Sequence, residues 1–476
     1  MPYHARFIDG ILRTWYAEPA RKPLVLRGAR QTGKTAAVRR FAETFDHSFE
    51  LNLERFDDAR LVRSCRSADE LLVALAARDN LAQIPARTLL FLDEIQAHPD
   101  AIGWLRFFYE DRPQLAVIAA GSLLEMRLHD RGFSFPVGRV TFRALRPFSF
   151  DEFLRATARD VLADRLRDAI QTLRPLPRPL HDDALAQLRD YLLIGGMPEA
   201  VRTWATTGDV QRVHQVHRDL HLAFTEDFQR LVDRKHLQPL EAAFAHLPQH
   251  YGLRYRYENF APGHASRSMK HALSRLEAAM LILQAQPTID QRLPLAPRPR
   301  AAHKLIPLDI GLALHAMQVP LAAMRRTPLD RLLDGRVAEM YAGQALLSQQ
   351  DAIPGQLFFW INATRSRAAE IDYLLPLHGR AVPIEVKAGR SGTLRSLHQY
   401  LHQADASVGV RLYAGELADD RLRVGLPDGS TLAYRLLSLP LYLAESVPLL
   451  PSAHLGDRPP PAPDPIDPLE NLSGSR

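Results

Sequence analysis

The residue pattern most suited to chemistry in this chain is a loop near the N-terminus that begins with glycine. It fits G-x-x-x-x-G-K-[ST] and consists of Gly28, Ala29, Arg30, Gln31, Thr32, Gly33, Lys34 and Thr35. Glycines let such a loop curl so that successive backbone N–H groups point at phosphate oxygens, and a following helix adds its positive N-terminal end. The Lys34 ammonium would reach the β- and γ-phosphates of a nucleotide, and the Thr35 hydroxyl would ligate Mg²⁺. The alternative is a glycine-rich turn without a ligand, but the apolar run before the loop and the helical pattern after it favour the phosphate site.

Two adjacent acids, Asp93 and Glu94, end the apolar run 89–94 (LLFLDE). Alone, they would indicate only the end of a strand. Downstream of a phosphate loop, they predict that Asp93 holds Mg²⁺ through water and that Glu94 polarises the attacking water. Gly121-Ser122 ends the next apolar run. There we expect Ser122 to sense the γ-phosphate or, alternatively, to cap the following helix.

Three acids and a lysine in the last third of the chain suggest a second, metal-dependent chemistry. Glu385 and Lys387 alternate with apolar residues in the run PIEVK, so a strand would place both on one face. Asp372 lies on the partner strand of a predicted hairpin, and Glu339 lies in a helical pattern upstream. Two or three of the carboxylates would hold Mg²⁺, which activates water and neutralises a scissile phosphate, while Lys387 would orient or deprotonate that water. The alternative is a solvated ion pair on a strand.

A helical pattern at 264–283 has one apolar and one basic side. The apolar residues recur at spacings of three and four: Met269, Leu273, Leu276, Met280 and Leu283. The basic side carries Arg267, Lys270, His271 and Arg275. A DNA-recognition helix has this arrangement, with one side packed and the other turned to phosphates and base edges. The alternative is a basic face that is only solvated.

The elements that must position these residues follow from periodicity. Residues 22–150 alternate apolar runs with helical patterns, which is typical of a parallel α/β sheet. Predicted strands lie at 22–28, 48–54, 88–94 and 114–121. Ser67 with Glu70, and Ser149 with Glu152, carry the signature of a helix start. A proline-rich break at 172–180 leads to a mostly helical middle third with a long pattern at 212–232, and 357–388 is predicted to form strands with a hairpin turn at 377–380.

The composition is that of a globular protein. The chain has 476 residues, of which 46% are hydrophobic and 24% charged, and this excludes a mainly disordered, collagen-like or disulfide-stapled protein. Sixty basic against 54 acidic residues give a net charge of +6, which permits nucleic acid binding without requiring it. Cys65 is the single cysteine, and the sequence has neither a signal pattern nor an apolar run of membrane-spanning length. We therefore expect a cytoplasmic protein that does not bind membranes.

The order and spacing of several short motifs resemble a known family. The motifs are GARQTGKT, LLFLDEIQ, AAGS, FPVGRV…LRPFSFDEF, GGMPE (195–199), KLIPLDIG (304–311) and IEVKAG, and together they span most of 5–445. The chain resembles the bacterial and archaeal AAA+ ATPases that carry a C-terminal domain of restriction-endonuclease-like fold. Ala29 stands where this family often has proline, which leaves the backbone cradle unaffected.

The resemblance implies roles for particular residues. Lys34, Thr35, Asp93 and Glu94 would form the ATP site, with Ser122 as a sensor. Arg139 stands in the family's Gly-Arg pair, where it would stabilise charge on a neighbouring subunit's nucleotide; the alternative is a surface or ion-pair role. The family places a winged-helix domain around the basic helix, with 287–300 as its wing. The order of Glu339, Asp372, Glu385 and Lys387 matches the PD-(D/E)xK nuclease core.

The combined prediction is a Mg²⁺-dependent AAA+ ATPase of α/β class that acts on DNA and forms a homo-oligomer. Its expected parts are a P-loop AAA+ core with a parallel sheet (1–150), a helical lid (151–235), a winged-helix-like domain (236–325), an α/β nuclease-like domain (326–450) and a disordered proline-rich tail (451–476). One alternative is an ATP-gated binding switch whose nuclease-like domain does not cut. The other is a protein-remodelling ATPase in stress response or defence. DNA binding would weaken steeply with salt, whereas protein remodelling predicts no such dependence.

Overall fold

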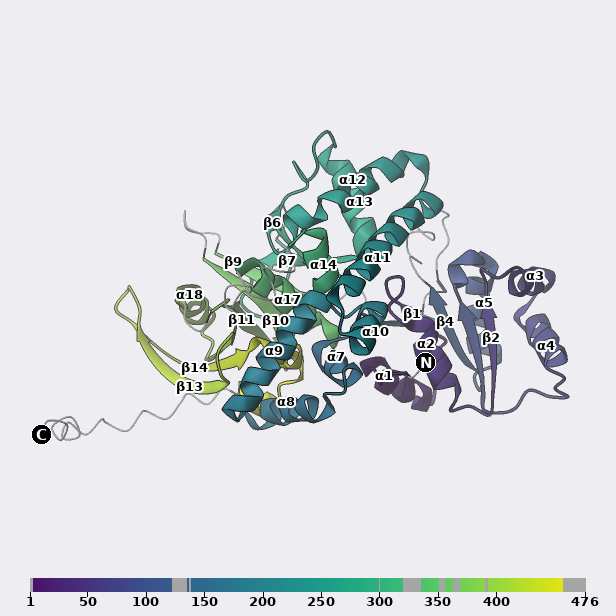
Figure 1. Ribbon diagram of the computed structural model, residues 1–476, viewed down its shortest axis with the longest axis horizontal. Helices are drawn as coiled ribbons and strands as arrows, with labels where there is room; N and C mark the ends of the chain where they lie inside the picture. Colours follow the sequence, from purple (N-terminus) through teal and green to yellow (C-terminus); the bar gives the residue numbers. More distant parts are fainter. Residues whose placement is uncertain are drawn as a thin grey trace, which may run out of the picture.

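Two β-sheets organise the molecule, one formed by the N-terminal part of the chain and one mainly by the C-terminal part. The computed structural model describes residues 3–121, 135–136, 138–298, 300–319, 335–350, 356–362, 369–389 and 393–456. In Figure 1 the sheets lie at opposite ends of the molecule, and the helices of residues 150–231 lie between them.

The N-terminal sheet is wholly parallel, with strand order β2-β3-β4-β1-β5. Its strands are β1 (Leu24–Arg27), β2 (His47–Asn52), β3 (Thr88–Asp93), β4 (Ala116–Gly121) and β5 (Thr141–Ala144). Its helices are α1 (Phe7–Ala17), α2 (Lys34–Ala42), α3 (Phe56–Ser64), α4 (Ala68–Arg78), the short η1 (Ile95–Ala97) and α5 (Pro99–Asp111). The parallel sheet and the four strands predicted from apolar runs are confirmed. Every residue of β3 and β4 is buried, because helices cover both faces of a parallel sheet.

Helices connect the two sheets. They are α7 (Phe150–Ala156), α8 (Asp160–Thr172), α9 (Arg178–Ile194), α10 (Pro198–Thr207) and α11 (Val210–Leu231). The predicted capping box of α7 is complete, because Ser149 accepts from the Glu152 amide and the Glu152 carboxylate accepts from the Ser149 amide. At α4 the box is incomplete: Ser67 accepts from the Glu70 amide, but the Glu70 carboxylate accepts from the Arg66 amide.

The second sheet has nine strands in the order β13-β14-β12-β11-β10-β9-β7-β8-β6. Its strands are β6 (Arg254–Tyr255), β7 (Ile282–Thr288), β8 (His303–Pro307), β9 (Phe358–Ile361), β10 (Glu370–Leu377), β11 (Arg380–Val386), β12 (Val408–Tyr413), β13 (Ala418–Gly425) and β14 (Thr431–Pro440). The helices around it are α12 (Arg234–His250), α13 (Ser266–Ala278), α14 (Ile310–Ala316), α17 (Gly335–Ser348), α18 (Arg395–Ala404), η2 (Leu441–Leu449) and η3 (Ser452–Leu455). The β10–β11 hairpin confirms the predicted turn, with Leu377 opposite Arg380.

This sheet runs across the boundary predicted between residues 325 and 326. β7 pairs in parallel with β9, through Gln286 opposite Phe358, so strands of the predicted winged-helix part and of the predicted nuclease-like part are neighbours. The four predicted domain boundaries stay predictions.

Two local predictions are wrong. The helical pattern 264–283 extends too far, because α13 ends at Ala278, Met280 is left-handed (φ +60°) and Ile282 already pairs with Pro307 in the sheet. Sheet pairing here overrides a spacing that also fitted a helix. The predicted start of disorder at residue 451 is too early, because Ser452–Leu455 forms a 3₁₀ turn and Leu455 is buried in the core. The proline-rich remainder, 457–476, lies outside the described residues.

Three sequence motifs meet at one point in the core. The Phe148 amide donates to the Gly196 carbonyl over 2.7 Å, and the Gly196 amide donates to Asp309 Oδ2 over 2.5 Å. Any Cβ on Gly196 would collide with the Phe148 carbonyl, and any Cβ on Gly195 with the Asp309 carboxylate. Glycine is therefore required where RPFSF, GGMPE and LDIG come together.

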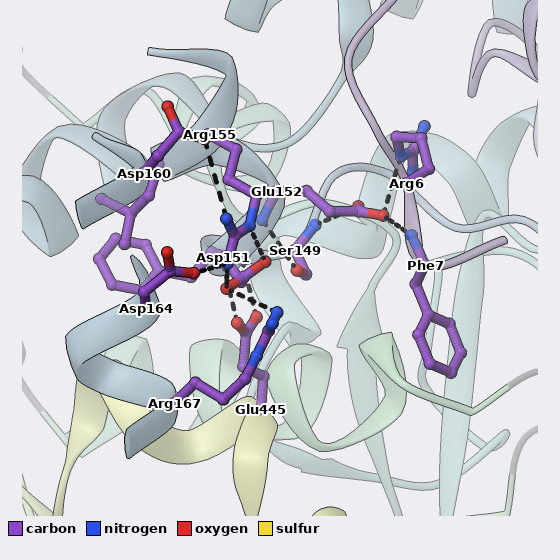
Figure 2. Close-up of polar contacts among 12 residues, drawn as sticks. Arg6, Phe7, Ser149, Asp151, Glu152, Arg155, Asp160, Asp164, Arg167 and Glu445 are labelled. Atoms are coloured by element: carbon purple, nitrogen blue, oxygen red, sulfur yellow. Dashed lines mark hydrogen bonds and ion pairs between the residues drawn. The ribbon is translucent and has the colours of Figure 1, made fainter. Parts of the chain in front are cut away.

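A second junction joins the N-terminus, the start of α7 and the C-terminal part of the chain (Figure 2). Arg6 Nε lies 3.0 Å from Glu152 Oε1, and Arg6 Nη1 donates to the Thr32 carbonyl over 3.2 Å. The Glu445 carboxylate accepts from the amides of Phe150 and Asp151, each over 2.8 Å. Side chains from both ends of the chain thus hold the first turn of α7.

Each helix in the described part of the chain is too short or too polar to cross a bilayer.

Candidate functional site

The loop between β1 and α2 has the backbone geometry that its glycines predict. Gln31 (φ +64°) and Gly33 (φ +95°) are left-handed. A Cβ on Gly28 would collide with the Leu145 carbonyl. Thr32 is buried and its hydroxyl donates to the Ala29 carbonyl over 2.9 Å, which fixes the curl of the loop.

Lys34, Thr35 and Asp93 converge at the end of this loop. Lys34 Nζ is buried and donates to the carbonyls of Gly28 and Ala29, each over 2.9 Å. Burial lowers the pKa of Lys34 to about 8, which Glu94 and Asp93 partly oppose. The Thr35 hydroxyl donates to Asp93 Oδ2 over 2.9 Å, and burial raises the pKa of Asp93. A hydroxyl and a carboxylate side by side are oxygen donors of the kind that Mg²⁺ prefers.

The other three residues predicted for this site do not share one environment. Glu94 directly follows β3, is left-handed (φ +52°) and accepts a hydrogen bond from Gln96. Arg139 lies half-exposed and contacts Glu110 of its own chain over 2.7 Å. Ser122 lies outside the described residues. The roles predicted for all three stay predictions.

Two contacts to the loop were not predicted. Arg30 Nη1 lies 2.6 Å from the buried Asp227 of α11, and Arg6 reaches the Thr32 carbonyl as described above. Their partners lie far away in the sequence, so no local pattern signals them. Through these contacts the loop touches both the N-terminal segment and the helices that follow the sheet.

The four residues predicted for the second chemistry come from three neighbouring elements. Glu339 lies on α17, Asp372 on β10, and Glu385 on β11, which Lys387 follows. Lys387 Nζ lies 2.6 Å from Glu385 Oε1, and Asp372 Oδ2 accepts from the Val386 amide over 2.8 Å. Burial, reinforced by Asp372, raises the pKa of Glu385 to about 7.

Lys304 of β8 lies among these acids and was not predicted as a site residue. Its ammonium lies 2.9 Å from Glu339, 2.6 Å from Glu370 and 3.4 Å from Asp372, and its side chain is 3% exposed. Burial works against its charge, but the carboxylates hold the pKa of Lys304 well above its usual range. Burial raises the pKa of Glu339 to about 7 against the pull of Lys304. One feature of the sequence could have identified Lys304 as a site residue: it is one of only six lysines and lies in the motif KLIPLDIG.

Where Mg²⁺ was predicted, other groups engage some of the carboxylate oxygens, and the role of these acids as metal ligands stays a prediction. Lys304 and the Val386 amide already engage both oxygens of Asp372. In the described part of the chain, no three acids bring carboxylate oxygens close enough to share one ion. A buried ammonium stands at the centre of the cluster instead.

Comparison with known proteins finds a family similarity in the segment that contains the first site. Residues 20–154 match the model of a family described as AAA domain, and this segment contains the loop, β3 and the acids after it. We refer to residues 20–154 as the AAA domain. Residues 185–322 and 334–426 match two domains of unknown function, DUF8612 and DUF4143. No curated protein matches the chain.

Several solved structures are similar to the chain at low identity. The Walker-type ATPase PABY2304 of Pyrococcus abyssi is 14% identical, with 65% of this chain and 94% of that one covered and a TM-score of 0.40. The ORC1 protein of Aeropyrum pernix, solved in complex with DNA, is 14% identical, with coverages of 68% and 94% and a TM-score of 0.30. PCH-2 of C. elegans is 12% identical, with coverages of 43% and 62% and a TM-score of 0.25.

Outside the AAA domain, two grooves are lined by basic residues. One, of about 510 Å³, lies between α12 and α13 and contains all four predicted nucleic acid contacts: Arg267, Lys270, His271 and Arg275. Arg267 and Lys270 are exposed, but Arg275 is buried and donates to His271 Nε2 over 3.0 Å. The predicted basic face is therefore narrower than its sequence suggests.

The second groove, of about 770 Å³, is lined by arginines from two segments. They are Arg254, Arg256, Arg298 and Arg300. The last two belong to the predicted wing, whereas the first two, around β6, were not predicted. Arg254 lies 3.2 Å from Glu370, which links this groove to the Lys304 cluster.

Proposed function

We propose that the AAA domain binds ATP with Mg²⁺ and hydrolyses it. The observation that carries this proposal is the convergence of Lys34, Thr35 and Asp93 at the end of a curled, glycine-dependent loop. The Thr35 hydroxyl and the Asp93 carboxylate would hold Mg²⁺, directly and through water. The ion would neutralise the charge that develops on the phosphates. Lys34 would exchange its two carbonyl partners for phosphate oxygens, and Glu94 would polarise the attacking water.

Substitutions at Lys34 and Glu94 test the separate roles of binding and hydrolysis. Lys34→Ala should weaken ATP binding, because Arg30, the other cation of the loop, pairs with Asp227 instead. Glu94→Gln should keep binding but lower turnover by at least about 100-fold, the usual contribution of a positioned base. Phosphate release and fluorescent-ATP titration measure the two properties. The matched control is Glu50→Gln, which changes a partly buried acid on the neighbouring β2 that pairs with Arg39. Equal turnover in Glu94→Gln and wild type would remove the role given to Glu94.

We further propose that the part around α12 and α13 binds duplex DNA. The helices α12 and α13 and the local strand order β6-β8-β7 support a winged-helix-like part, whose wing we predict at 287–300. Support comes from the exposed Arg267 and Lys270 on α13 and from the arginine groove beside β6. Such side chains contact phosphates, and the second groove would follow the backbone next to the helix.

Salt-dependent binding distinguishes this proposal from a solvated basic face. Arg267→Ala with Lys270→Ala should leave folding intact, because both side chains are exposed, yet weaken duplex binding and flatten the slope of log K against log[salt] by about two. Arg421→Ala with Arg423→Ala, exposed on β13, removes the same charge elsewhere. Fluorescence anisotropy with a labelled duplex measures both. If both double variants bind alike, the basic face plays no part in DNA binding.

For the C-terminal part we propose a nuclease-like fold that does not cut. The order α17-β9-β10-β11-α18-β12, with β11 parallel to β12, and the order of Glu339, Asp372, Glu385 and Lys387 support the nuclease-like fold. The position of Lys304 favours a role in binding. The same oligonucleotides, incubated with Mg²⁺ or Mn²⁺, should stay intact with wild type and with Lys387→Ala alike. Cleavage by wild type that Lys387→Ala abolishes would instead establish a nuclease.

A further inference from the structure

Three histidines from two helices gather where α11 contacts α14. His214 and His217 lie one turn apart on α11, and His315 lies near the end of α14. Their ring centroids are 4.8 Å (His214–His315), 5.5 Å (His217–His315) and 5.7 Å (His214–His217) apart. One nitrogen of each ring lies within 4.8 Å of the other two. No acid or cysteine belongs to this group of described residues, and the cluster has no part in the function proposed above.

The hydrogen bonds of the cluster determine where its lone pairs lie. His217 Nε2 lies 3.0 Å from the Ile194 carbonyl, which can only accept, so Nε2 carries the proton and Nδ1 carries a lone pair. That Nδ1 is buried without a hydrogen-bond partner in the described structure. His315 Nδ1 and His214 Nδ1 lie 3.1 Å apart, so at most one of them carries the proton between them. An imidazole whose second nitrogen donates to a backbone carbonyl is the usual form of a metal-binding histidine.

We propose that His214, His217 and His315 bind one divalent transition-metal ion, Zn²⁺ or a close analogue such as Co²⁺, through their Nδ1 atoms. Tetrahedral zinc with nitrogen ligands at 2.0–2.1 Å requires neighbouring ligand atoms about 3.3–3.4 Å apart, close to the His214–His315 separation. A set of three imidazoles without carboxylates excludes Mg²⁺ and Ca²⁺. Burial lowers the pKa of all three rings, so they are neutral as ligands must be. His214 and His315 are only partly buried, which leaves access for a water molecule as fourth ligand.

The bound ion would tie α11 to α14. Towards its other end α11 carries Asp227, the partner of Arg30 in the phosphate loop. α14 is capped by Asp309, whose carboxylate accepts from the Gly196 amide. The metal would therefore fix the helix that touches the nucleotide loop against the part of the chain that carries the second sheet.

Metal titration of the full, untagged chain tests this site. The chain carries Cys65→Ser, which removes the one thiol, and is stripped with a chelator and then titrated with ZnCl₂ or CoCl₂ without nucleotide. We expect one equivalent to bind, the visible absorption of Co²⁺ to appear, and the unfolding midpoint to rise with metal. His214→Gln and His315→Gln, at the two partly buried positions, should each lower the affinity by more than about 100-fold, the upper end of what loss of an outer hydrogen-bond partner costs.

The control is His402→Gln, which removes an exposed histidine on α18. It should bind metal as the parent does. The proposal fails if the parent binds no Zn²⁺ or Co²⁺ above background. It also fails if His214→Gln and His315→Gln fold and bind metal with the affinity of His402→Gln. Should either glutamine variant unfold, the Co²⁺ spectrum of the parent decides, because three-imidazole coordination gives visible bands and adventitious carboxylate binding does not.

Discussion

Glu445 shows how a single buried carboxyl can set the pH dependence of stability. It accepts from the amides of Phe150 and Asp151, which favours its charged form. Burial outweighs this effect and, with the nearby Asp151, raises its pKa to about 8. Because the folded pKa lies above the unfolded value, the native state binds the proton more tightly. The stabilisation is complete at low pH and is lost as pH rises from the unfolded value toward 8.

We therefore expect Glu445→Gln to gain stability relative to wild type as pH rises from 5 to 8. Glutamine is a neutral isostere that does not titrate, so the difference in unfolding free energy should change by up to about 1.4 kcal/mol per pH unit. Urea unfolding at several pH values measures it. Glu416→Gln, an exposed acid paired with Arg178, is the control and should show a difference independent of pH over this range. A parallel pH profile of Glu445→Gln and wild type would contradict the assignment.

Also at the residue scale, the sequence predicts a residue's contacts well only when its partners lie nearby in the chain. Lys34 and Thr35 belong to a contiguous loop, so their neighbourhood is encoded locally. The role of Lys304 depends on its ion pairs with Glu339, Glu370 and Asp372, and only folding brings these acids close to it. The order of acids in the sequence therefore predicted a cluster but not the ammonium at its centre.

At the scale of elements, strands covered on both faces were easier to predict than the limits of helices. β3 and β4 are short apolar runs bounded by polar residues, and only a covered parallel strand fits them. The pattern at 264–283 fitted a helix through Leu283, yet the chain leaves α13 after Ala278 because β7 finds partners in β8 and β9. Those partners lie further along the chain, so periodicity within the segment could not reveal them.

The junction of Phe148, Gly196 and Asp309 gives a physical reason for three motifs that carry no chemistry by themselves. Backbone approaches backbone so closely there that no side chain fits on Gly196, and the buried Asp309 satisfies its amide. Gly311 is constrained in the same way, because a Cβ on it would collide with the backbone at Ile194 and Gly195. The motifs thus fix the positions of α9, α14 and the segment before α7 relative to one another. The phosphate loop lies beside this junction, since Gly33 is close to Pro198.

At the scale of the whole molecule, the hydrophobic core divides the chain once rather than three times. Two clusters fill the two faces of the parallel sheet of the AAA domain. A third cluster contains Ala29 of the phosphate loop and then runs from Phe148 to Leu455, through α7–α14, α17 and the second sheet. A fourth cluster joins α18 to β9, β10 and β14. The boundaries predicted near 235 and 325 cut through the third cluster, whereas a division near residue 147 separates only Ala29 from it.

We therefore expect two unfolding transitions in calorimetry of the full chain. Residues 148–456 should unfold together, because removing any part of the third cluster exposes the apolar surface of the rest. Mg²⁺ with ATP, added to Glu94→Gln so that the nucleotide persists, should raise the midpoint of the AAA transition most, since a ligand stabilises the unit that binds it by RT ln(1 + [L]/Kd). Lys34→Ala measured with the same nucleotide is the control and should show a much smaller shift. Three or four transitions would instead support the boundaries predicted from sequence. A single transition that shifts as a whole would mean that the contacts of Arg6 with Glu152 and of Arg30 with Asp227 join the two units into one.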